Sequence, residues 1–224
     1  TLPMVKVKEQ HAEALAQLAE LTRGVYAKNQ FPIVLGGEHS LTAGALEGLL
    51  KSRGASQSVT ILQFDAHTDL RDQLDGTKLS HACAMRRSLE LSQNFNLVQI
   101  GIRSMSEEEL PFWRLHSNRI ATIFAKDKAR WSFKEIIQHC QSQVYLSFDV
   151  DVLDPSIMPS TGTPEPGGLI WYEVLSILRA VSKEREIIGA DFNELAPIAS
   201  LSAPDFLVAK LVYKLIGYMV TQSQ

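Results

Sequence analysis

The chain has 224 residues, of which 45% are hydrophobic and 21% charged, and 22 basic against 25 acidic side chains give a formal charge of -3. These proportions are typical of a globular chain with one substantial core, so we expect residues 1–224 to form a single domain. The sequence contains no basic cluster of the kind that binds nucleic acid. It also contains no run of about 18 apolar residues, the length that a membrane-spanning helix needs. The two cysteines, Cys83 and Cys140, lack a CxxC pattern. They are expected to be buried thiols in a reducing, cytoplasmic compartment rather than a disulfide or a zinc ribbon.

Helical and strand patterns alternate along the sequence. Apolar residues at helical spacing predict a helix over 11–27, and the apolar run 31–35 then predicts a strand. The same rhythm predicts further strands at 58–64, 96–102, 119–124, 143–150 and 186–192, and further helices at 41–53, 82–91, 107–116, 131–140, 171–184 and 203–219. Continuous apolar strands between helices imply an α/β fold of three layers, α/β/α, around a central, mainly parallel sheet.

In such sheets, ligands bind beyond the carboxyl ends of the strands. The irregular stretch 154–168 follows a predicted strand and is too long for a structural turn, so it is a candidate active-site loop. Within it, Asp154 is interpreted as a turn former before Pro155. Glu107, Glu108 and Glu109 are interpreted as the first turn of a helix, facing water.

Polar side chains follow three of the predicted strands directly. Asp65, His67 and Asp69 stand at alternate positions, which places them on one side of an extended segment. Together the three strand ends carry two histidines and four aspartates: His39, Asp65, His67, Asp69, Asp149 and Asp151. Four converging carboxylates would repel one another strongly unless cations neutralised them.

An oxygen-rich donor set with two imidazoles favours Mn²⁺ over structural zinc, with Fe²⁺ or Co²⁺ as alternatives. Six donors suit a pair of ions that share bridging carboxylates and a hydroxide. Two divalent cations would cancel the four aspartates, and the hydroxide would leave one negative charge. The sequence therefore predicts a small cationic substrate and a water-derived nucleophile that is active near neutral pH.

Five segments, in order, resemble the ureohydrolases, the family of arginase and agmatinase. They are GGEHS at 36–40, FDAHTD at 64–69, SFDVDVLDP at 147–155, GTPEPGG at 162–168 and DFNELAP at 191–197. The resemblance implies an arginase-like fold and a site for two Mn²⁺ ions. His39, Asp65, Asp69 and Asp149 would hold one ion, and His67, Asp65, Asp149 and Asp151 the other, with Asp65 and Asp149 bridging.

In this family a metal-bridging hydroxide attacks a guanidinium carbon, and urea and an amine are released. By position, Glu194 would pair with the guanidinium and orient it. His81 would bind substrate and shuttle protons, and Asp69 would donate a proton to the leaving amine. The predicted activity is therefore that of a hydrolase acting on linear amidine C–N bonds.

The segment 69–87 lacks the Asn- and Ser-rich stretch by which arginases hold an amino acid, and it resembles agmatinases instead. Asp72 and Asp75 would favour an amine tail on the substrate. Agmatine, hydrolysed to putrescine and urea in polyamine biosynthesis, is the predicted substrate. Arginase, another guanidino-acid hydrolase and an aminopropylagmatine ureohydrolase are alternatives within the enzyme class. A metal-binding homologue without catalytic activity is the alternative from a different class.

The resemblance also carries two expectations about the whole protein. Family members usually have several dozen more residues before the point where this chain begins, including a first strand, so we expect the usual N-terminal segment to be lacking. The family is commonly trimeric or hexameric, which implies a homo-oligomer.

Overall fold

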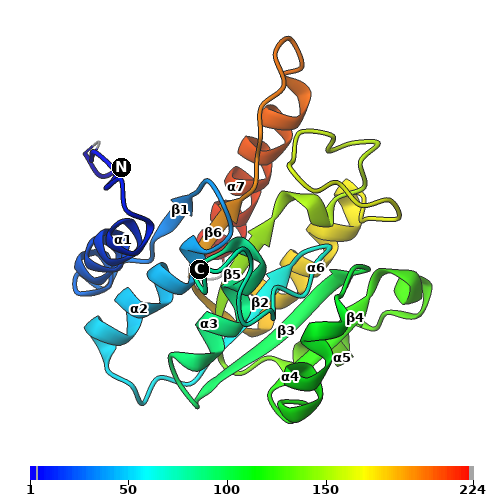
Figure 1. Ribbon diagram of the computed structural model, residues 1–224. Helices are drawn as coiled ribbons and strands as arrows, with labels where there is room; N and C mark the ends of the chain where they lie inside the picture. The colour runs from blue at the N-terminus through cyan, green and yellow to red at the C-terminus, as the bar shows by residue number, and fades with distance from the viewer. Residues whose placement is uncertain (4, 222–224) are drawn as a thin grey trace.

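The computed structural model describes residues 1–3 and 5–221, and its centre is one sheet of six strands. All pairings in this sheet are parallel, and the strand order is β1-β6-β5-β2-β3-β4 (Figure 1). The strands are β1 (Ile33–Leu35), β2 (Val59–Phe64), β3 (Phe95–Ile102), β4 (Ile120–Phe124), β5 (Gln143–Asp149) and β6 (Glu186–Asn193). The α-helices are α1 (His11–Tyr26), α2 (Leu41–Arg53), α3 (Ala84–Glu90), α4 (Leu110–Leu115), α5 (Phe133–His139), α6 (Trp171–Glu184) and α7 (Ala203–Thr221).

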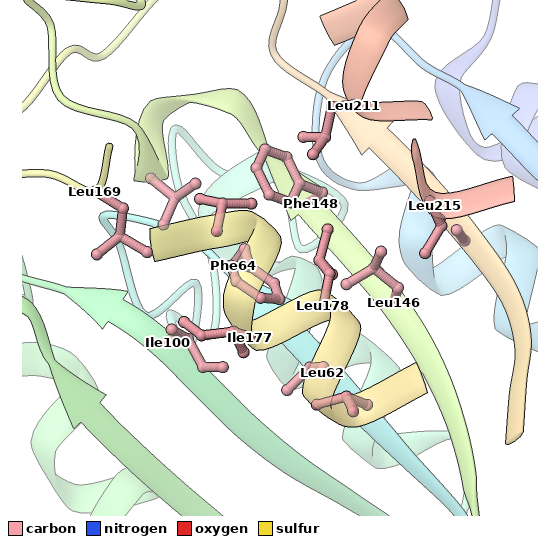
Figure 2. Packing of buried hydrophobic residues seen from close by; sticks show 14 of the residues in the cluster. Leu62, Phe64, Ile100, Leu146, Phe148, Leu169, Ile177, Leu178, Leu211 and Leu215 are labelled. Atoms are coloured by element: carbon pink, nitrogen blue, oxygen red, sulfur yellow. The ribbon is translucent and has the colours of Figure 1, made fainter. Parts of the chain in front are cut away.

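Successive side chains of the central strands point to opposite faces of the sheet, so they form two apolar layers. Leu62 and Phe64 of β2 pack on one face of the sheet, with α5, α6 and α7. Ile61 packs on the opposite face, with residues of α1, α2 and α3. Figure 2 shows Ile177 and Leu178 of α6 among the side chains of the first layer. Each fully buried side chain of this size contributes about 1.5–3 kcal/mol. The predicted three-layer α/β/α arrangement is confirmed.

The register of the sheet brings four strands to an end at one level. Leu35 pairs with Phe192, Phe192 with Phe148, and Phe148 with Phe64. The phenylalanine rings also touch, with centroids 5.3 Å apart for Phe64 and Phe148 and 5.5 Å apart for Phe148 and Phe192. The residues after this row therefore emerge side by side at the carboxyl edge of the sheet.

The predicted strands and helices are all present, and their ends differ where local chemistry decides. The helix expected over 107–116 starts as a 3-10 turn, η2 (Glu107–Glu109), before α4. The strand expected to reach residue 150 ends at Asp149, because the side chain of Asp149 accepts a hydrogen bond from the Asp151 amide and starts the 3-10 turn η4 (Val150–Val152). Within the described residues, no helix is both long and apolar enough to cross a bilayer.

Candidate metal centre

The segment after β2 holds Asp65 and His67 in place through short-range hydrogen bonds. The Asp65 carboxylate accepts one bond from the Gln63 side chain at 2.7 Å and another from the His67 amide at 2.6 Å. Gln63 in turn accepts a hydrogen bond from Gln99 of β3. Gly101 has a φ of +96°, and a Cβ there would lie 2.6 Å from Val152 and 3.1 Å from the Asp65 carbonyl oxygen. The close approach of β3 to Asp65 therefore requires a glycine.

Asp69 adopts an unusual backbone conformation. Its φ is +52°, in the left-handed region that costs a residue with a Cβ about 1–2 kcal/mol. Its carbonyl oxygen accepts hydrogen bonds from the Met85 and Arg86 amides at the start of α3, at 3.1 and 3.2 Å. Asp69 is buried, so its carboxylate is held away from bulk solvent at the edge of the sheet.

Asp151, in the turn that follows β5, reaches the segment after β2. One oxygen of Asp151 accepts a hydrogen bond from the Ala66 amide at 2.9 Å, and the other lies 2.9 Å from His67 Nδ1. Thr163, in the long loop after η4, donates to the same oxygen at 3.2 Å. The two strand ends are thus joined through their acidic side chains.

His39 supplies the third part of the cluster from the turn between β1 and α2. Its ring is fully buried, and Nδ1 lies 2.9 Å from Asp69, 3.1 Å from Asp65 and 3.5 Å from Asp149. None of these oxygens is placed to accept a well-formed hydrogen bond from Nδ1.

The hydrogen bond at the other ring nitrogen, Nε2, accounts for the missing hydrogen bond at Nδ1. Nε2 lies 2.7 Å from the Ser147 hydroxyl oxygen, and that hydroxyl donates to Asp191 at 2.9 Å. Because the Ser147 hydroxyl donates its hydrogen to Asp191, its oxygen accepts a hydrogen bond from Nε2–H of His39. In the neutral ring, Nδ1 of His39 therefore carries the lone pair and faces the carboxylates. Burial alone would lower the pKa of His39, but the carboxylates of Asp65 and Asp69 raise it well above its usual range.

Donor atoms from these residues form two groups, each compact enough to hold an ion. One group is His39, Asp65 and Asp69, the other is Asp65, His67 and Asp151, and within each the donor atoms lie within 4.8 Å of one another. Asp65 belongs to both. A buried imidazole lone pair surrounded by carboxylate oxygens fits a divalent cation, and the shared Asp65 fits two neighbouring ions.

The pKa values of the candidate ligands are shifted, because the side chains are buried and their charges lie close together. Burial and the charge of Asp65 raise the pKa of Asp69 to about 7. Burial and the charge of Asp151 raise the pKa of Asp149 well above its usual range. Burial alone would lower the pKa of His67, but the carboxylates of Asp151 and Asp65 raise it to about 11. Without cations, this cluster therefore retains protons that an ion would displace.

A cavity of about 280 Å³ opens above the cluster and is lined by His67, Asp69, His81, Asp149, Thr163 and Glu194, among others. Glu194 follows β6 with a φ of +64°, and its carboxylate accepts a hydrogen bond from the His39 amide at 2.8 Å. Burial raises the pKa of Glu194. His81 begins the 3-10 turn η1 (His81–Cys83), its side chain is 48% exposed, and its Nδ1 lies 4.0 Å from Glu38.

The long loop after η4 is fastened beside the cavity. Asp154 accepts hydrogen bonds from Ser156 at its start and from the Gly167 and Gly168 amides at its end. The guanidinium of Arg103 donates to the carbonyl oxygens of Asp151 and Glu165, at 2.6 and 2.8 Å. Asp154 forms the predicted turn, and it also closes the loop.

A comparison of the chain with known protein families agrees with this geometry. The family model described as the arginase family matches residues 2–217. The chain belongs to the arginase family.

Individual relatives show how much of an arginase-family protein this chain represents. It is 40% identical over 192 residues to the N(1)-aminopropylagmatine ureohydrolase of Synechocystis sp., which covers 84% of this chain and 61% of that protein. It is 35% identical over 186 residues to the agmatinase of Pyrococcus horikoshii, covering 83% of this chain and 62% of that protein. The crystal structure of the agmatine ureohydrolase of Thermoplasma volcanium superimposes with a TM-score of 0.83 at 31% identity, covering 96% of this chain and 71% of that one. The chain thus spans about three fifths of the length of these curated relatives.

One interpretation of an acidic residue in this arginase-family chain is wrong, and another gains no support. Asp72 pairs with Arg87, Arg86 and Lys78, and neither it nor Asp75 is among the residues that line the cavity, so their role toward an amine tail stays a prediction. Glu109 does not face water. It is 4% exposed and bonds to Thr68 and Leu70 on either side of Asp69.

Other partners of the predicted ligands were not expected from the sequence. Ser147 and Asp191 behind His39, and Arg103 under the long loop, act across strands, so no local pattern marks them. Glu109 has a local signal, because Ser106 and Glu109 have the spacing of a capping box and form one. The structure brings the six predicted ligands together and places His81 and Glu194 on the wall of the same cavity.

Proposed function

We propose that this arginase-family chain is the catalytic part of a binuclear manganese ureohydrolase that releases urea from a small cationic guanidine, with agmatine as the leading substrate. The observation that carries the proposal is the meeting of His39, Asp65 and Asp69 with His67 and Asp151 around a shared carboxylate below a cavity. Bound Mn²⁺ ions would lower the pKa of a water molecule and so supply a nucleophile near neutral pH.

The six ligands are assigned by position and reach. His39, Asp65, Asp69 and Asp149 would hold the ion nearer α2, and His67, Asp65, Asp149 and Asp151 the other. The distances of Nδ1 of His39 from three carboxylates support the first set, and the 2.9 Å separation of His67 and Asp151 supports the second. The two oxygens of Asp65 lie toward different imidazoles, as a bridging carboxylate requires.

Glu194 is proposed to bind the substrate's guanidinium. Its carboxylate lines the cavity and is tethered to the His39 amide, so it is held beside the ligands. A buried carboxylate that meets a guanidinium forms strong charge-assisted hydrogen bonds and fixes the orientation of the planar group. The carbon under attack would then be held over the carboxyl edge of the sheet, where orientation lowers the barrier to reaction.

Two other residues that line the cavity are assigned roles in proton transfer. Asp69 is the proposed donor to the leaving amine, because it lines the cavity beside the other ligands and a carboxylate in that place can take up a proton from the attacking water and pass it on. His81 lies at the exposed side of the cavity and is proposed to exchange protons with solvent.

The tail of the substrate is proposed from the walls of the cavity and from the relatives. Leu74, Ala82 and Met105 line the cavity and fit a methylene chain. The compared proteins named above act, by their names, on agmatine or N(1)-aminopropylagmatine. We keep agmatine, the substrate predicted from the sequence, as the leading candidate and place aminopropylagmatine second.

The test is urea release from the Mn²⁺-loaded protein with a substrate panel of agmatine, N(1)-aminopropylagmatine, arginine and guanidinobutyrate. Urea from agmatine or aminopropylagmatine supports the proposal. A preference for arginine or guanidinobutyrate would overturn the assigned tail and keep the reaction class. No urea from any guanidine, in a protein that binds Mn²⁺, would support a metal-binding homologue without activity.

Two variants separate catalysis from folding. Asp65→Asn removes the charge of the shared ligand and is expected to abolish urea release and reduce the number of bound ions. Glu107→Gln removes one exposed carboxylate outside the cavity and is expected to change neither. Equal rates of urea release by Asp65→Asn and Glu107→Gln would contradict the assignment of Asp65 to the metal site.

A further inference from the structure

Glu109 is a buried carboxylate that the reaction outlined above does not use. One oxygen accepts hydrogen bonds from the Thr68 hydroxyl at 2.5 Å and from the Leu70 amide at 2.8 Å. The other accepts from the amide and hydroxyl of Ser106, at 2.7 and 2.9 Å. All four donors are neutral groups, and together they engage both carboxylate oxygens, which fixes the position of the side chain.

These contacts surround one residue. Thr68 and Leu70 are the immediate neighbours of Asp69, and both are fixed by the same oxygen of Glu109. Asp69 has the left-handed φ of +52°, and such a conformation persists only where its surroundings enforce it. The hydrogen bonds from α3 to the Asp69 carbonyl act from the other side.

We propose that Glu109 is a positioning residue that holds the Asp69 backbone in its left-handed conformation and thereby aims the Asp69 carboxylate at His39. The inference rests on the proposed metal site, because Asp69 with His39 and Asp65 forms one of the two ion-binding groups. Glu109 also joins that ligand to the cavity wall, since Ser106 lines the cavity and is bound to the second oxygen.

Only one of the two ion-binding groups depends on Asp69. The other consists of Asp65, His67 and Asp151, which are held by Gln63, Ala66 and Thr163 and not by Glu109. Loss of the Glu109 contacts is therefore expected to weaken one of two binding steps. If Glu109 only stabilised the fold, its replacement would lower the free energy of unfolding, and the two Mn²⁺-binding steps would not differ in their response.

The test compares Mn²⁺ binding, measured by titration calorimetry, in the wild-type protein, Glu109→Gln and the matched control Glu107→Gln. Glutamine keeps the size of the side chain but turns one acceptor into a donor, which cannot satisfy both groups of Ser106 or both neighbours of Asp69. Glu109→Gln is expected to weaken one binding step about 10- to 100-fold, as changes behind metal ligands do, and to spare the other. Glu107→Gln is expected to match the wild type.

A second pair of variants, at Thr68, keeps the inference testable if Glu109→Gln fails to fold. Thr68→Val deletes only the hydroxyl that reaches Glu109, and Thr68→Ser retains it. Thr68→Val is expected to weaken the same binding step, and Thr68→Ser to restore it. The thermal unfolding temperature of each metal-free variant is recorded alongside, so that a change in stability is seen separately from a change in affinity.

Unchanged Mn²⁺ affinity in Glu109→Gln and Thr68→Val, even with lower unfolding temperatures, would overturn the inference and leave the proposed reaction standing. Equal weakening of both steps would also overturn it. If the wild-type protein bound no Mn²⁺, the metal site and this inference would fail together. Urea release enters none of these outcomes, so failure of the proposed activity is distinguishable.

Discussion

Nε2 of His39 lies 2.7 Å from the hydroxyl oxygen of Ser147, while Nδ1 of the same ring faces Asp69 at 2.9 Å. The serine hydroxyl donates a hydrogen bond to Asp191, so its oxygen is the acceptor for Nε2–H of His39. A histidine that binds a metal through one nitrogen is commonly oriented by a hydrogen bond at the other.

Replacing Ser147 by alanine tests this orientation. Ser147→Ala leaves Nε2–H of His39 buried without an acceptor and frees the ring to change tautomer. We expect Mn²⁺ affinity to fall about 10- to 100-fold and the protein to lose about 1–3 kcal/mol of stability. Titration calorimetry and urea unfolding measure the two effects. Ser182→Ala removes a buried hydroxyl in α6 and serves as the control, with no change in affinity expected. Equal affinities would contradict the role of Ser147.

Metal removal is expected to destabilise the fold, because an ion that binds the native ligand cluster and not the unfolded chain stabilises the native state. Mn²⁺ at about 100 times its dissociation constant stabilises the native state by about 2.7 kcal/mol. For a chain of this size, that corresponds to an unfolding temperature about 5–10 °C higher than in the presence of chelator. Differential scanning calorimetry with and without chelator measures it. A transition that does not respond to Mn²⁺ would mean that the ligands do not bind it.

Mn²⁺ affinity is expected to rise with pH. Asp69, with a pKa of about 7, and His67, with a pKa of about 11, hold protons below those values in the metal-free protein, and each must lose its proton to bind an ion. At least one proton is therefore displaced across this range, so the affinity should rise by about tenfold or more per pH unit, and more steeply below about pH 7, where Asp69 also holds its proton. Calorimetry from about pH 6 to about pH 9, in buffers of different ionisation enthalpy, counts the released protons. An affinity that is flat with pH would contradict these pKa shifts.

Removal of the Glu194 charge is expected to affect the substrate and spare the metal. Glu194→Gln keeps an oxygen for the His39 amide, so the fold around His39 should persist. Loss of a charge-assisted hydrogen bond is worth about 1.5–3 kcal/mol, which corresponds to a roughly 10- to 100-fold lower kcat/KM for agmatine. Steady-state kinetics and Mn²⁺ titration separate the two effects. Glu186→Gln, at the opposite end of β6, is the control. An unaltered kcat/KM in Glu194→Gln would exclude it from guanidinium binding.

The sequence predicted the site well where its signal is local. Asp65, His67 and Asp69 stand directly after an apolar strand, which places them at the carboxyl edge of the sheet. The extended backbone that their alternation predicts does not persist to Asp69, whose φ is +52°. Glu109 shows the opposite case, since a glutamate in the first turn of a helix normally faces water. Its burial follows from the packing of η2 against the β2 segment, which the sequence around Glu109 does not encode.

The surroundings of Asp72 likewise depend on residues outside its own loop. An acidic residue in a loop next to a candidate site looks available for a cationic substrate, yet α3 brings Arg86 and Arg87 to it. Whether a surface charge is free or neutralised depends on which helix packs beside its loop, and distant residues decide that.

The sequence by itself determined the alternation of strands and helices, the parallel character of the sheet and the identity of the six candidate ligands. Hydrophobic periodicity and the residues that follow each strand are local properties, so they can be read along the chain. Only the tertiary structure decided which of these residues meet. The strand order β1-β6-β5-β2 brings His39 beside Glu194, 155 residues away in the chain, and beside the ends of β2 and β5. Strand order and register arise from the packing of the whole sheet between two helical layers, which no single segment specifies.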